Sequence, residues 1–81
     1  MGLMSELDIE RQNYVKELSG LSDYKLVSRY LKYYELHLKI KPDIDRFFLI
    51  MAEIDKDGCR DAIIRLTANW YIAEKMKEVG L

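Results

Sequence analysis

The middle of the chain reads Phe47-Phe48-Leu49-Ile50-Met51-Ala52, six apolar residues in succession. Ile44 before this run and Ile54 after it keep the spacing of a helix, and no second strand is visible for pairing, so we expect a helix rather than a buried strand. A helix with this run carries apolar side chains on every side. A chain of 81 residues has few neighbours to cover it, so its own helices, a second copy or a partner must do so.

Turn residues on both sides of this run divide the chain into about four helices. Ser19-Gly20, Pro42 and Asp57-Gly58 mark the breaks. The connection between the first two helices is so short that they should form a helical hairpin. We therefore predict an all-α fold, a compact bundle in a single domain spanning residues 1–81. The predicted helices cover residues 5–18, 23–40, 43–56 and 59–79.

The protomer core is predicted from the apolar faces of the second and fourth helices. The second helix is apolar over about half its circumference, which indicates contact with two neighbours. Apolar residues of the fourth helix step by four and three, the spacing of a bundle seam. The residues expected in the core are Leu26, Tyr30, Leu66 and Trp70.

Composition excludes several classes of protein. Hydrophobic residues make up 49% and charged residues 33%, with four glycines and one proline, so the chain is not of the disordered type. The single cysteine, Cys59, excludes an internal disulfide and suits a reducing compartment. A net charge of −1 gives no general attraction to nucleic acid or anionic lipid. No apolar stretch approaches the roughly 20 residues of a membrane span, so we expect a cytoplasmic protein without membrane contact.

Side chains that commonly carry catalysis are few. The only histidine, His37, lies on an apolar helix face, which favours a role in the core or an interface. Cys59 has no histidine near it in sequence to act as its base. Phosphate-binding glycine loops, zinc-ligand spacings and a serine elbow are absent from the sequence. We expect no enzyme activity, no catalytic residue, no metal site and no cofactor.

Apolar residues outnumber the positions that four single-faced helices need. This surplus favours an interface, and the simplest case is a homo-oligomer, with a dimer as the first expectation. We predict a small interaction or regulatory module that self-associates and covers the surface of a protein partner, by analogy with small regulators of phages and bacteria. The expected interface residues are Phe47, Leu49, Ile50, Tyr71 and Ile72.

Residues 19–31 contain a Gly-hydrophobic-Ser turn, then Val27-Ser28-Arg29 and a leucine. This stretch resembles the turn and recognition helix of helix-turn-helix DNA-binding proteins, although here the triplet comes one residue later after the glycine. The resemblance implies that the second helix faces the major groove and that its basic side chains contact phosphates. Nucleic-acid binding is therefore the alternative function. The residues that it would use are Tyr24, Lys25, Ser28, Arg29, Lys32 and Lys39.

Overall fold

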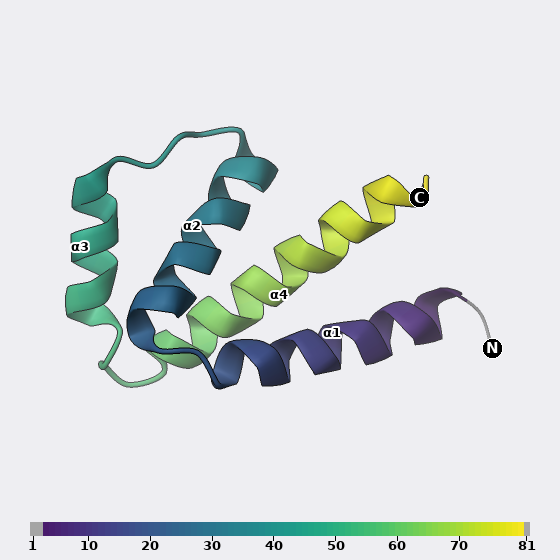
Figure 1. The fold of residues 1–81 in the computed structure, drawn as a ribbon, viewed down its shortest axis with the longest axis horizontal. Coiled ribbons are helices and arrows are strands. Elements are labelled where there is room, and N and C mark those ends of the chain that lie inside the picture. Colours follow the sequence, from purple (N-terminus) through teal and green to yellow (C-terminus); the bar gives the residue numbers. More distant parts are fainter. Residues whose placement is uncertain (1–2, 81) are drawn as a thin grey trace.

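The structure, a computed structural model, describes residues 3–80 and contains four helices and no strand in that range (Figure 1). The prediction of an all-α bundle is thereby confirmed. The helices are α1 (Leu3–Ser19), α2 (Asp23–Leu38), α3 (Ile44–Glu53) and α4 (Cys59–Glu78).

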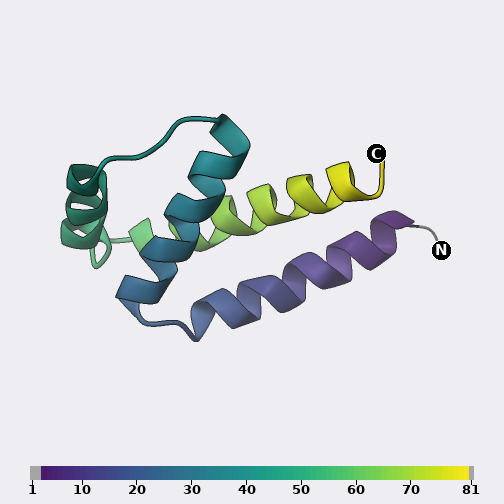
Figure 2. The same cartoon turned by 45° about the horizontal axis from the view of Figure 1, so that its top comes forward.

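Helix α4 is the centre of the arrangement, because it packs against both α1 and α2 (Figures 1 and 2). Helices α1 and α4 run antiparallel, so the start of α1 and the end of α4 lie at the same end of the molecule. Helix α3 lies at the other end and packs against α2. The bundle is elongated, with extents of 42 × 25 × 17 Å.

The turn between α1 and α2 forms the predicted hairpin, and α4 holds it in place. Ser22 caps α2, since its hydroxyl accepts a hydrogen bond from the backbone N–H of Lys25 at 3.3 Å. Arg60 of α4 donates to the Asp23 carboxylate at 2.6 Å and to the Leu21 carbonyl oxygen at 2.6 Å. One guanidinium therefore ties the start of α4 to the hairpin turn.

The helix ends differ from the predicted ones by up to three residues. Helix α2 ends at Leu38 rather than residue 40, because Lys39 takes the left-handed conformation (φ 61°, ψ 29°) and donates its N–H to the Glu35 carbonyl. Helix α3 begins after the Asp43 cap and ends at Glu53 rather than residue 56. Gly58, with φ 73°, then redirects the chain into α4.

The core joins all four helices at the end of the bundle where α2 crosses α4. One polar residue, Thr67, is buried there, and its hydroxyl donates to the Ile63 carbonyl at 2.7 Å. Half-buried Tyr30 and Trp70 contact each other at 5.4 Å between ring centroids. The buried residues of this cluster are Tyr14, Leu18, Leu26, Val27, Ile54, Ile63, Ile64 and Ala68.

The prediction that Leu66 belongs to the core is wrong, whereas that for Leu26 is confirmed. Leu66 is 42% exposed, and Leu26 is fully buried. The contact face of α4 passes through Ile63 and Thr67 instead. A threonine is tolerated there because the backbone of the preceding turn satisfies its hydroxyl.

Candidate protein interface

Helix α3 carries an apolar surface that its own chain leaves open. Its inner side chains, Phe47, Ile50 and Met51, are only half-buried against the core, and none of its ten residues is fully buried. Three further apolar side chains of α3, Ile44, Phe48 and Leu49, are exposed by 69%, 59% and 67%. We call these three side chains the outer face of α3.

An apolar groove runs between α2 and α3, which lie antiparallel (Figure 1). It has a volume of about 460 Å³, and Pro42 and Asp43 of the connection between the two helices also line it. The ring of Tyr24 meets that of Phe47 edge to face, with centroids 5.4 Å apart, and both rings line the groove. The side chains along its two walls are Tyr24, Ser28 and Leu31 of α2 and Ile44, Phe47 and Phe48 of α3.

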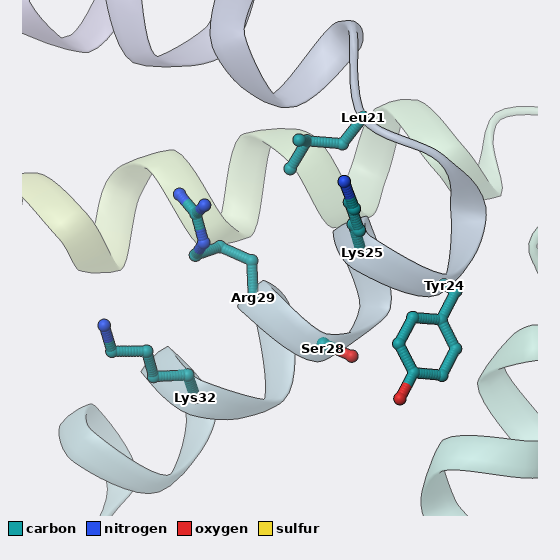
Figure 3. A pocket seen from close by; sticks show the side chains of 6 residues that line it. All are labelled: Leu21, Tyr24, Lys25, Ser28, Arg29 and Lys32. Atoms are coloured by element: carbon teal, nitrogen blue, oxygen red, sulfur yellow. The ribbon is translucent and has the colours of Figure 1, made fainter.

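A second, basic groove lies on the other side of the same α2 surface (Figure 3). In Figure 3 Lys25 and Arg29 point toward α1, whereas the Tyr24 ring lies on the side of α3. Five of the six residues predicted to contact nucleic acid line this groove, and the sixth, Lys39, lies in a neighbouring groove with Lys32. The residues of the basic groove are Leu21, Tyr24, Lys25, Ser28, Arg29 and Lys32.

Arg29 is held by protein contacts rather than free for a ligand. Its Nη1 atom donates to the Tyr14 hydroxyl at 2.9 Å and to the Glu17 carboxylate at 3.0 Å. The hydrogen bond to Tyr14 is the main cause that raises the pKa of Arg29, and burial raises the pKa of Tyr14 to about 12. Within residues 3–80, Lys25 and Lys32 take part in no ion pair, so they supply the available charge.

The apolar and basic grooves share Tyr24 and Ser28. The two grooves therefore form one surface along α2, which is apolar on the side of α3 and basic on the side of α1. Tyr24, 63% exposed, stands at the border between the halves. A ligand that covers both halves would need an apolar face with an acidic edge.

The residues predicted for the interface do not share one surface. Leu49 lies on the outer face of α3, while Phe47 and Ile50 are partly buried against the core. Tyr71 and Ile72 are half-buried on α4. The Tyr71 ring stacks on Tyr14 at 3.9 Å between centroids and its hydroxyl donates to Glu10, so this tyrosine joins α4 to α1.

The interface residues predicted from the sequence do not include Leu31 of the apolar groove or Ile44 and Phe48 of α3. Phe48 lies within the apolar run, and Ile44 keeps the helical spacing before it. The spacing alone did not show which side of α3 turns toward α2.

The two reactive side chains lie elsewhere. His37 stacks on Trp70, and its Nδ1 atom lies 3.8 Å from a Glu74 carboxylate oxygen. Cys59 is a free, half-buried thiol that packs against the core. Among residues 3–80 no group of three or more His, Cys, Asp or Glu residues is placed to hold a metal ion. In the same range no helix has the length and apolar character needed to span a bilayer.

Comparison of the chain with models of protein families, with curated proteins and with solved structures finds no match.

Proposed function

We propose that this protein is a small helical interaction module that self-associates through α3 and regulates a protein partner by covering its surface. The observation that carries the proposal is the outer face of α3, where Ile44, Phe48 and Leu49 are each more than half exposed on one helix of ten residues. Contiguous apolar patches of this kind mark interaction sites on soluble proteins.

The total accessible surface supports an uncovered interface. The chain exposes 5625 Å², against about 5,100 Å² expected for a compact monomer of 9.6 kDa. The radius of gyration of 13.4 Å likewise exceeds the value of about 11.7 Å expected for this length. A second copy on α3 would bring the protein closer to the usual ratio of surface to mass.

The outer face alone would give only weak association. Full burial of a Leu, Ile or Phe side chain contributes about 1.5–3 kcal/mol, and these side chains are already partly covered. Six of them, three from each copy, contribute on the order of 10 kcal/mol before the cost of association, which is about 4–15 kcal/mol. A stable complex therefore needs further contacts beside α3.

Light scattering over a range of protein concentrations tests the proposal. We expect a dimer whose mass falls to that of the monomer for Leu49→Asp. Leu66→Asp is the matched control, because it makes the same change at a leucine that is exposed on α4. A wild-type protein that remains monomeric at every concentration would contradict self-association.

A second candidate, nucleic-acid binding, is favoured by the gathering of five expected contact residues in the basic groove. Exposed Tyr24 could stack on a base there while Lys25 and Lys32 contact phosphates. We expect any binding of duplex DNA to weaken steeply with salt and to disappear for Lys25→Glu with Lys32→Glu. A mobility shift that ignores both salt and these substitutions would contradict this candidate.

A further inference from the structure

We infer that the apolar groove between α2 and α3 receives α3 of a second copy, with the acidic edge of that helix against Lys25 and Lys32. This inference rests on the proposed self-association and names its geometry. It also supplies the contacts that the outer face of α3 lacks by itself.

The apolar groove has the form of a site for an amphipathic helix. Two antiparallel helices make its walls, and the aromatic pair Tyr24 and Phe47 connects one wall with the other. Helices bind such grooves through apolar side chains that repeat every three or four residues. The occupant must therefore present a short apolar stripe.

Helix α3 presents such a stripe. Ile44, Phe48 and Ala52 follow one another at intervals of four residues on its exposed side, with Leu49 beside them. The helix is already formed and capped by Asp43, whose carboxylate accepts from the Arg46 N–H at 3.0 Å. Docking therefore requires little ordering of backbone, which favours affinity.

The charges of the two surfaces are complementary. Asp45 and Glu53 border the exposed stripe of α3 and are eight residues apart, or about 12 Å along a helix. Lys25 and Lys32 of α2 are seven residues apart, or about 10 Å. Lys25, Lys32 and Asp45 take part in no ion pair within residues 3–80, and Glu53 holds only the exposed Lys56. Pairs at the rim fix register and orientation more than they add affinity.

The inferred dimer has its two-fold axis along the helices, and this axis sets the direction of the occupant. Helix α3 runs antiparallel to its own α2 (Figure 1), so a two-fold axis along the helices makes the second copy's α3 antiparallel to that α2 as well. Asp45 of the second copy then lies near Lys32, and its Glu53 lies near Lys25. Each copy supplies one helix and one groove to the contact. The contact is therefore complete in a dimer and does not continue into a filament.

Three sets of variants test this geometry by sedimentation or light scattering. Ser28→Trp places an indole in the apolar groove and should raise the dimer Kd at least tenfold. Lys25→Glu with Lys32→Glu should raise it by a similar factor, and so should Asp45→Lys with Glu53→Lys. An equimolar mixture of the two charge-reversed proteins should form a heterodimer, detected by energy transfer between labelled chains.

Two controls distinguish loss of the groove contact from effects of net charge and from misfolding. Lys16→Glu with Arg65→Glu makes the same change of net charge at exposed positions outside both grooves and should leave the Kd unchanged. Far-ultraviolet circular dichroism of each variant should retain the helical signal of the wild type.

Different experimental results would contradict the groove geometry, the self-association or the pairing of charges. A dimer that Leu49→Asp dissociates, but that tolerates Ser28→Trp and both charge reversals, would overturn the groove geometry and keep the proposed self-association. A wild-type monomer at all concentrations would overturn both. Loss of the dimer in the charge reversals without recovery in the mixture would show that Lys25 and Lys32 do not face Asp45 and Glu53.

Discussion

The imidazole of His37 stacks on the indole of Trp70, with ring centroids 5.9 Å apart and planes inclined by 24°. The His37 Nδ1 atom is buried, and within residues 3–80 it has no hydrogen-bond partner. Glu74, whose carboxylate oxygen lies 3.8 Å from that nitrogen, also pairs with Lys77. The contact joins α2 to α4 near the end of α2.

Alkaline pH should destabilise the fold through Tyr14. Burial raises its pKa from the ordinary value of 10.0 to about 12, so the folded protein holds this proton more tightly than the unfolded chain. Because the folded pKa is raised, its contribution to stability is complete below pH 10 and is lost as the pH rises toward 12.

Urea unfolding at several pH values between 9 and 12, with tyrosinate absorbance as a second readout, measures this loss. Tyr14→Phe should make the free energy of unfolding less dependent on pH in this range, although it removes the bond from Arg29. An equally steep dependence in the variant would assign the effect to Tyr30 or Tyr71, whose pKa values burial also raises.

Removal of the Arg60 guanidinium should loosen the hairpin turn. Arg60 makes two hydrogen bonds of 2.6 Å, to the Asp23 carboxylate and the Leu21 carbonyl, and a longer one to Ser19. Hydrogen bonds to charged groups contribute about 1.5–3 kcal/mol when buried, and partial exposure lowers this. We expect Arg60→Ala to lower the free energy of unfolding by about 1–2 kcal/mol.

Arg60→Lys is the informative companion variant. It keeps the charge but loses the fork of donors that reaches a carboxylate and a carbonyl together, so it should restore less than half of the loss. Full restoration by lysine, measured by urea unfolding, would show that charge rather than donor geometry holds the turn.

Lys39→Gly should stabilise the protein. Lys39 adopts a left-handed conformation that disfavours a side chain by about 1–2 kcal/mol, and glycine adopts it freely at the end of a helix. Glycine also loses more entropy on folding, so we expect a net gain of about 0.5–1 kcal/mol in the free energy of unfolding. Lys41→Gly, in the connection that follows, should be destabilising or neutral.

Much of the fold was predictable because local signals agreed with each other. The Ser22 cap, the Gly20 turn and the helical spacing around the apolar run each placed a helix in its correct region. The end of α2 was not predictable, because a lysine has no intrinsic preference for the left-handed conformation that Lys39 takes. The prediction that Leu66 is buried was wrong because the spacing of apolar residues in α4 is compatible with two different buried faces. The face that is buried contains a threonine, Thr67.

The candidate interface was predictable only in part. The surplus of apolar residues pointed to α3, and Leu49, one of the residues predicted for the interface, has an exposed side chain there. Tyr71 is of a residue type that is common at interfaces, yet its ring and hydroxyl contact Tyr14 and Glu10 of α1. Distinguishing these uses requires the relative rotation of the helices, which depends on packing across the whole bundle.

Because α3 buries none of its own residues fully, it should be the first helix to open. Its backbone amides would exchange with solvent through a local unfolding that leaves the other three helices intact, since only Ile54, just beyond its end, anchors it deeply. Hydrogen exchange should therefore be fastest in this helix, and the proposed self-association predicts that it slows as the protein concentration rises. Any molecule that covers α3 would protect this helix, which is expected to unfold locally most readily, from proteolysis.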